Sequence, residues 1–131
     1  YASSFYGPFR EAAQGAPKEG DRQGYQMNPA NGDEAFLAAE QDLNEGADCL
    51  LVKPGMIYAD VLYRVTKAHP GVPIGAYHVS GEYAALKLMA DAELVDERVA
   101  VMEVHEGLLR AGAQYIVTYY ACEIAEWLKQ K

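Results

Sequence analysis

The sequence has one lysine whose position suits covalent chemistry. Lys53 follows the apolar run at residues 49–52 and precedes Pro54-Gly55. An amine taken out of water at the end of a buried strand loses its proton more readily, and a neutral amine attacks a ketone to form a Schiff base. The resulting iminium withdraws electrons from the neighbouring carbon. The alternative is a lysine that extends its ammonium group from a strand end into solvent.

Two hydroxyl groups fall at comparable places farther along the chain. Ser80 follows a predicted strand and Tyr119 lies near the end of another, where a hydroxyl can donate a hydrogen bond to a substrate carboxylate. Each also has a structural alternative, because Ser80 can cap the following helix and Tyr119 can simply pack. Of the histidines, His78 belongs to no recognisable triad, His69 is predicted at a helix end and His105 on a helix surface.

The first 32 residues are dense in glycine and proline, which predicts a long loop with one helical turn near residues 10–14. Arg10 and Arg22 lie in this loop. A guanidinium group binds a carboxylate through two parallel hydrogen bonds, and a mobile loop that carries one can close over an anionic substrate. An ordinary solvated surface is the other interpretation of these two arginines.

The remaining pattern alternates helices and strands. Gly46 and Gly112 stand where helices end, and aligning these two glycines places Lys53 opposite Tyr119. The strands are short and apolar, as in parallel sheets buried on both faces. We expect helices at residues 33–45, 58–67, 83–90, 96–110 and 121–130, and strands at residues 49–52, 72–77 and 114–120.

This alternation predicts an α/β fold with a parallel sheet and right-handed crossovers. A (β/α)8 TIM barrel needs about 250 residues, so a chain of 131 residues would supply only its C-terminal part, about the last three strands with their helices. A small doubly wound sheet is the competitor, but no GxGxxG or GxxxxGK[ST] motif follows a strand. We therefore expect residues 1–131 to be the C-terminal part of one TIM-barrel domain, with residues 1–32 as an active-site lid loop and 33–131 as αβ units.

The composition argues against some classes of binding partner. The net charge is −8 without a basic run, which predicts no nucleic-acid binding, and the longest apolar stretches are too short to predict a membrane span. Cys49 and Cys122 lack CxxC spacing, as expected for a cytoplasmic protein. The start at Tyr1 is abrupt, which suggests a piece of something longer.

Several motifs together resemble the 5-aminolevulinate dehydratase family, also called porphobilinogen synthase. They span essentially the whole chain in the family's order, and the VKPGM and YxVSGE patterns are highly specific. The matching segments are Ser4-Phe5-Tyr6-Gly7-Pro8-Phe9-Arg10, Gly20-Asp21-Arg22, Tyr25-Gln26-Met27, Glu45-Gly46-Ala47-Asp48, Val52-Lys53-Pro54-Gly55-Met56, Tyr58 with Asp60, Tyr77-His78-Val79-Ser80-Gly81-Glu82 and Thr118-Tyr119-Tyr120.

The resemblance implies an enzyme that condenses two 5-aminolevulinate molecules, with loss of two waters, into porphobilinogen, an early step of tetrapyrrole (heme and chlorophyll) biosynthesis. Lys53 matches one of the family's two Schiff-base lysines, the one that holds the substrate of the P site. Ser80 and Tyr119 match the groups that bind the carboxylate of that substrate.

The same resemblance assigns a second set of residues. Arg10, Arg22 and Gln26 match lid residues that hold the second substrate in the A site, whereas Asp60 and Glu82 look structural. The family also implies a homo-octamer and a divalent metal, zinc or magnesium, but no organic cofactor.

Some family features are not expected in this chain. The second Schiff-base lysine and the metal ligands lie before the equivalent of Tyr1, so we predict no metal ligand here and an isolated chain that is inactive. Ala38 takes the place of a glutamate that helps to bind an allosteric magnesium ion in some bacterial members.

Two other functions stay open. A truncated barrel could serve as a non-catalytic subunit or interaction module. A different Schiff-base barrel, such as an aldolase for a phosphorylated sugar, would need a glycine-rich phosphate site after the last strands, where this chain has Ser80 and Tyr119.

Overall fold

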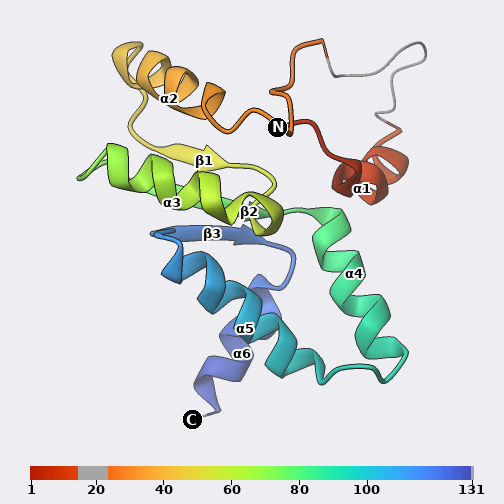
Figure 1. The fold of residues 1–131 in the computed structure, drawn as a ribbon. Coiled ribbons are helices and arrows are strands. Elements are labelled where there is room, and N and C mark those ends of the chain that lie inside the picture. The colour runs from red at the N-terminus through yellow and green to blue at the C-terminus, as the bar shows by residue number, and fades with distance from the viewer. Residues whose placement is uncertain (15–23, 131) are drawn as a thin grey trace.

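The structure is a computed structural model that describes residues 1–14 and 24–130. Its centre is a three-stranded parallel sheet of β1 (Leu50–Val52), β2 (Ile74–His78) and β3 (Tyr115–Thr118), in the order β1-β2-β3 (Figure 1). Because all three strands are parallel, their carboxyl ends meet at one edge of the sheet. The predicted α/β class and the parallel sheet are confirmed.

Helices connect the strands as the sequence predicts. Gly46 and Gly112, with φ of +99° and +107°, follow the ends of α2 and α5, in the left-handed conformation that favours glycine. The helices are α2 (Glu34–Asn44), α3 (Ala59–Ala68), α4 (Ser80–Asp91), α5 (Glu97–Arg110) and α6 (Ala121–Lys129), and a short 3₁₀ helix, η2 (Met56–Tyr58), precedes α3.

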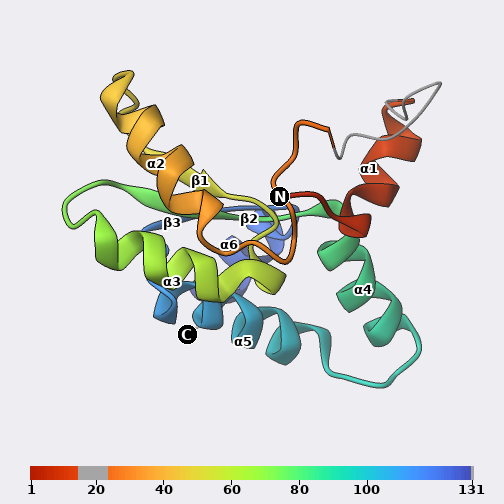
Figure 2. The same ribbon diagram turned by 45° about the horizontal axis from the view of Figure 1, so that its top comes forward.

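The strand order decides where the helices lie. Since the order never reverses, both right-handed crossovers fall on the same side of the sheet, and α3 and α5 cover that side (Figure 2). We call this side the covered face; it carries Leu50, Ile74, Ala76, His78 and Thr118. The opposite side, the open face, carries Leu51, Gly75, Tyr77, Tyr115 and Val117.

Two clusters of buried side chains form the core. The larger lies between the covered face and α3, where Leu62 and Ile74 are fully buried. The smaller joins α4, α5 and α6 around Leu86, Val101 and Tyr120. No helix within residues 1–14 and 24–130 is long and apolar enough to cross a membrane.

The structure corrects three expectations. The strands are not all buried on both faces, because Leu51 and Val117 are 43 % and 39 % exposed on the open face. Lys53 is not level with Tyr119: Val52, Ala76 and Ile116 form one row, so Tyr119 lies two residues beyond the level of Lys53. An offset of two keeps both side chains on the open face.

The third correction concerns residues 4–12, which we call the first segment. Instead of one turn near residues 10–14, a 3₁₀ helix, η1 (Ser4–Tyr6), leads directly into α1 (Gly7–Ala12). Pro8 favours this earlier start, because proline suits the first turn of a helix, where its missing N–H costs nothing.

Candidate functional site

Lys53 lies in the turn that follows β1, and several backbone contacts fix this turn. Its carbonyl oxygen accepts hydrogen bonds from the Tyr6 hydroxyl and the Tyr1 nitrogen, both at 3.1 Å. Two residues on, the Gly55 N–H donates to the Tyr77 carbonyl at 2.7 Å. A Cβ at Gly55 would lie 3.0 Å from that carbonyl, so glycine permits the close approach of the turn to β2.

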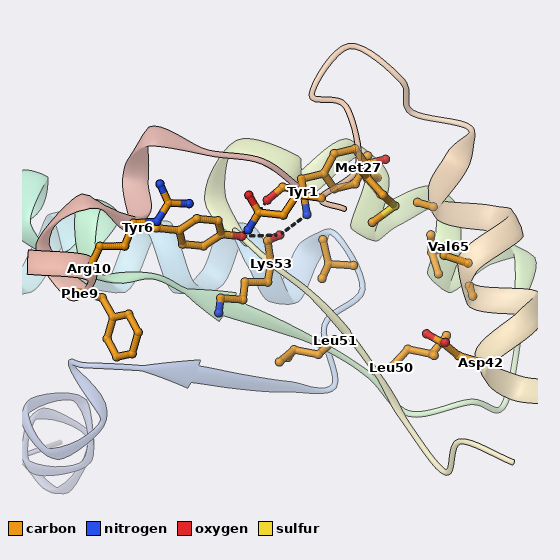
Figure 3. Close-up of a pocket in the computed structure, with 16 residues that line it drawn as sticks. Tyr1, Tyr6, Phe9, Arg10, Met27, Asp42, Leu50, Leu51, Lys53 and Val65 are labelled. Carbon is orange, nitrogen blue, oxygen red and sulfur yellow. Dashed lines mark hydrogen bonds between the residues drawn. The ribbon is translucent and has the colours of Figure 1, made fainter. Parts of the chain in front are cut away.

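Two aromatic rings flank the amine. The Lys53 Nζ lies 5.0 Å from the centre of the Tyr6 ring and 5.1 Å from the centre of the Tyr77 ring, within the range of a cation–π interaction. Figure 3 shows the side chain running below the Tyr6 ring toward Phe9. Lys53 is nevertheless exposed within the part of the chain that the structure describes. The prediction that its amine is taken out of water is therefore wrong for these residues.

Glu82 joins the turn after β1 to the turn after β2. One carboxylate oxygen, Oε1, accepts from the N–H groups of Met56 at 2.9 Å and Ile57 at 3.3 Å, while Oε2 accepts from the Val79 N–H at 2.9 Å. Burial raises the pKa of this carboxyl, and the backbone donors oppose that shift. Glu82 is thus a structural clamp that fixes the backbone on both sides of the site.

Ser80 does not cap α4, since Val79 is the N-cap and Glu82 binds its N–H. The buried Ser80 hydroxyl instead holds the first segment: Oγ accepts from the Phe9 N–H at 3.1 Å and donates to the Phe5 carbonyl at 3.5 Å. A Cβ at Gly81 would collide with the Phe5 backbone. The segment therefore rests directly on the start of α4.

Tyr119 follows β3, and its ring centre lies 5.5 Å from that of Tyr83. Burial raises the pKa of Tyr119, and hydrogen bonding to Tyr77 raises it further. Lys53, Ser80 and Tyr119 line one small cavity of about 30 Å³, so the three side chains lie together as the sequence predicts. It is lined by Tyr6, Phe9, Lys53, Tyr77, Val79, Ser80 and Tyr119.

A second, larger cavity of about 330 Å³ also borders Lys53 (Figure 3). Arg10 and Gln26 line it together with Lys53. The Arg10 guanidinium lies 5.3 Å from the centre of the Tyr6 ring, and its buried Nε has no hydrogen-bond partner among the described residues. Arg22, the remaining predicted binding residue, lies outside the described residues.

The two cavities meet at three side chains, Tyr6, Phe9 and Lys53, which line both. Tyr6 is buried, and burial raises the pKa of its hydroxyl to about 12, so it remains a neutral hydrogen-bond donor to the Lys53 carbonyl. Residue chemistry alone did not identify Tyr6 and Tyr77 as neighbours of the amine. The position of Tyr77 near the end of β2, beside the strand that precedes Lys53, is the signal that could have found it.

The structure separates the three histidines. His69 is the C-cap of α3, which confirms its predicted place at a helix end. His105 is 5 % exposed, so its predicted position on a helix surface is wrong. His78 is fully buried on the covered face, and burial, with a smaller effect of His105, lowers its pKa to about 4.

Ligands for a metal ion are not gathered anywhere in residues 1–14 and 24–130. No group of three or more His, Cys, Asp or Glu side chains in this part of the chain could hold one. Ala38 and Asp42 line the larger cavity, but they offer a single carboxylate. The described residues therefore do not fit a resident metal on their own.

Comparisons with known proteins extend over the whole chain. The family model for delta-aminolevulinic acid dehydratase matches residues 1–127. A curated delta-aminolevulinic acid dehydratase from Macaca fascicularis is 47 % identical over 131 residues, which are 100 % of this chain and 40 % of the relative. One from Staphylococcus aureus is 50 % identical over 128 residues, 98 % of this chain and 39 % of the relative.

A solved structure is similar to the same extent. The Toxoplasma gondii delta-aminolevulinic acid dehydratase (porphobilinogen synthase), crystallised in complex with the reaction product porphobilinogen, superposes with a TM-score of 0.96 at 48 % identity. The match covers 100 % of this chain and 38 % of that protein. The chain thus spans about 40 % of the length of the curated relatives and corresponds to their C-terminal portion.

Proposed function

The chain belongs to the delta-aminolevulinic acid dehydratase family, and on that premise we propose that it is the C-terminal part of a porphobilinogen synthase. The reaction is the condensation of two 5-aminolevulinate molecules to porphobilinogen with loss of two waters. The observation that carries the proposal is the meeting of two cavities at Lys53, because a reaction between two substrates needs two binding places that lie side by side.

We further propose that the sheet is a segment of a (β/α)8 TIM barrel. In a barrel the strands follow one another in sequence order with all helices outside, and β1-β2-β3 with α3 and α5 on one face has that form. The open face would then look into the barrel, where strands from the rest of the protein cover Leu51 and Val117. A doubly wound sheet would reverse its order instead.

Lys53 would act as the nucleophile of the P site. Its neutral amine attacks the ketone carbon of one substrate, a C–N bond forms, and the carbonyl oxygen leaves as water to give an iminium. The iminium then accepts electrons as a neighbouring C–H bond loses its proton. The rings of Tyr6 and Tyr77 attract a positive charge at Nζ, so they would stabilise the iminium as well as the free ammonium group.

The small cavity would hold the carboxylate of this first substrate. Ser80 and Tyr119 both line this cavity and both carry a hydroxyl group, which pairs well with a carboxylate as a hydrogen-bond donor. The Phe9 N–H could remain on Ser80, because Oγ can accept from Phe9 and donate to the carboxylate at the same time. Residues 5–9 would thus stay docked over the bound substrate, in keeping with their predicted role as part of a lid.

In the complete barrel the preceding strand would pair with β1 and fill the part of the larger cavity that runs along Leu50–Val52. The part beside Lys53, Arg10 and Gln26 would receive the second substrate, in the A site. Arg10 would pair with the carboxylate, Gln26 would add a hydrogen bond, and Arg22, which lies outside the described residues, is the third residue proposed for this role.

The rest of the family's machinery belongs to the remainder of the protein in this proposal. That remainder would supply the second Schiff-base lysine and the ligands of a zinc or magnesium ion, which polarises oxygen atoms when bound. A cytoplasmic homo-octamer completes the proposal, and the 131-residue chain alone would be inactive.

Trapping of the Schiff base tests the role of Lys53. The complete protein is incubated with 5-aminolevulinate and borohydride, and mass spectrometry locates the adduct. We expect reduced substrate on Lys53, and Lys53→Ala should lose both this adduct and at least a thousandfold in kcat/KM, about 4 kcal/mol of transition-state stabilisation.

Two outcomes would reject this proposal. An unchanged adduct pattern in Lys53→Ala would show that the amine is elsewhere, and a complete protein that traps no substrate and forms no pyrrole would favour the non-catalytic module. The matched control is Lys67→Ala, because Lys67 lies in the last turn of α3 with its Nζ 5.5 Å from the Tyr63 ring and lines neither cavity.

A further inference from the structure

Thr118 closes a small turn around Tyr119. It is the last residue of β3, and its side-chain oxygen accepts a hydrogen bond from the Tyr120 N–H at 3.2 Å. This bond spans two residues and encloses Tyr119, whose φ and ψ angles it restricts. Thr118 faces the covered side, whereas Tyr119 faces the cavity.

His105 fixes the direction of the Thr118 hydroxyl. The His105 Nδ1 lies 2.7 Å from the Val101 carbonyl, and because a carbonyl only accepts, Nδ1 carries the proton. Burial lowers the pKa of His105, which favours the neutral ring. Its Nε2 then has a lone pair, so the Thr118 hydroxyl donates to Nε2 at 2.9 Å.

His78 adds a contact from the neighbouring strand. With its proton given to His105, the Thr118 oxygen can only accept, so the His78 Nδ1–H donates to it at 3.4 Å. The two imidazole rings lie 5.0 Å apart between centres, in an edge-to-face arrangement. His78 precedes Ser80 by two residues, so the network joins the strand that leads to Ser80 with the strand that leads to Tyr119.

Tyr120 anchors the other side of the turn. Its side chain is fully buried, its hydroxyl donates to Glu97 at 3.1 Å, and its ring packs 4.7 Å from that of Tyr83 between centres. Tyr119 is 44 % exposed but stands between two residues that the covered side holds firmly. The backbone at Tyr119 is therefore set from behind, by groups that do not reach the cavity.

We propose that Thr118 is a positioning residue, which acts through Tyr119 by linking its backbone to His105 and His78. The inference rests on the proposed function, since it assigns Thr118 to the placement of the Tyr119 hydroxyl for the carboxylate of the first substrate. A carboxylate contact is made in the bound ground state and the transition state alike, so a misplaced hydroxyl raises KM and leaves kcat nearly unchanged.

The test compares threonine variants of the complete protein by steady-state kinetics with 5-aminolevulinate. Thr118→Val keeps the shape but loses the hydroxyl, and we expect KM to rise about fivefold with kcat within twofold. Thr118→Ser keeps the hydroxyl and should restore KM to within twofold. Thr66→Val is the matched control, because the buried Thr66 hydroxyl in α3 has no partner among the described residues and Thr66 lines neither cavity.

A double-mutant cycle separates positioning from general damage. In a Tyr119→Phe background the hydroxyl to be placed is gone, so Thr118→Val should raise KM less than twofold further. An equal rise in both backgrounds, a failure of Thr118→Ser to restore KM, or an equal effect of Thr66→Val would overturn the inference. These results differ from failure of the proposed function, in which the parent protein itself forms no porphobilinogen.

Discussion

The two faces of the sheet have opposite properties although they alternate residue by residue. The covered face is sealed by α3 and α5, and Ile74, Ala76 and His78 on β2 are fully buried there. The open face leaves Leu51 and Val117 exposed, and Lys53 and Tyr119 continue it beyond the strands. Packing thus fixes the backbone from one side, while the proposed site residues Lys53 and Tyr119 stand on the other.

The largest contrast between the faces should appear in stability. Leu62, fully buried in α3 against the covered face, should cost roughly 4 kcal/mol of unfolding free energy when changed to alanine, through lost burial and a cavity. Leu51→Ala should cost roughly 2 kcal/mol in the complete protein, because the proposed barrel covers it. Denaturant unfolding measures both.

The Leu51 value carries the test of the barrel. A cost below roughly 0.5 kcal/mol is what an exposed surface position gives, and in the complete protein it would contradict a barrel closed over the open face. The Leu62 variant is the reference that shows the assay can detect a core defect.

Acid should weaken the covered face through His78. An unfolded chain protonates this imidazole below about pH 6.5, but the folded protein does so only near pH 4, because burial opposes the charge. The stability from neutral His78 is therefore fully present above pH 6.5 and is lost as pH falls toward 4, by roughly 3 kcal/mol.

His78→Gln removes this titration, so its unfolding free energy should fall less steeply than that of the parent between pH 6.5 and 4. Denaturant titrations at several pH values supply the comparison. Parallel profiles for parent and variant would mean that His78 does not sense the acid.

Adjacent tyrosines give the smallest but most direct contrast. Tyr119→Phe should raise KM for 5-aminolevulinate about tenfold, or 1.4 kcal/mol, with little change in melting temperature, because Tyr119 lines the cavity and is exposed. Tyr120→Phe should cost about 1 kcal/mol of stability, since it breaks the hydrogen bond to Glu97. A Tyr119→Phe variant that melts early with an unchanged KM would reverse this assignment.

Much of this arrangement could be predicted from the sequence. Gly46 and Gly112 mark the helix ends, and the apolar runs after them give strands whose carboxyl ends meet. Those two facts bring Lys53, Ser80 and Tyr119 to one edge, and the structure finds all three around one cavity. Local signals suffice here because parallel α/β units repeat one connection.

Other features depend on partners distant in the chain. His105 lies beside Glu106 and close to Glu103, and so resembles a surface position, but Thr118, 13 residues on, provides a partly buried partner. The prediction that Lys53 lies level with Tyr119 was wrong by two residues. The register of β1 and β3 is set by their pairing with β2, and it cannot be obtained by counting residues after Gly46 and Gly112. Ser80 stands where a capping residue of α4 is expected, but the Glu82 carboxylate binds the N-cap N–H instead. The Ser80 hydroxyl therefore binds the first segment, through the Phe9 N–H.

In the proposed site the Ser80 hydroxyl would also link carboxylate binding to the docking of residues 5–9. The Phe9 N–H that donates to Oγ withdraws electron density from it and makes the Ser80 proton a better donor. The Ser80 hydroxyl itself donates only a long hydrogen bond, 3.5 Å, to the Phe5 carbonyl. A carboxylate could therefore accept a hydrogen bond from this hydroxyl while the Phe9 N–H remains on Oγ. Where both contacts coexist, a docked first segment would strengthen carboxylate binding, and by thermodynamic reciprocity the carboxylate would strengthen docking by the same factor.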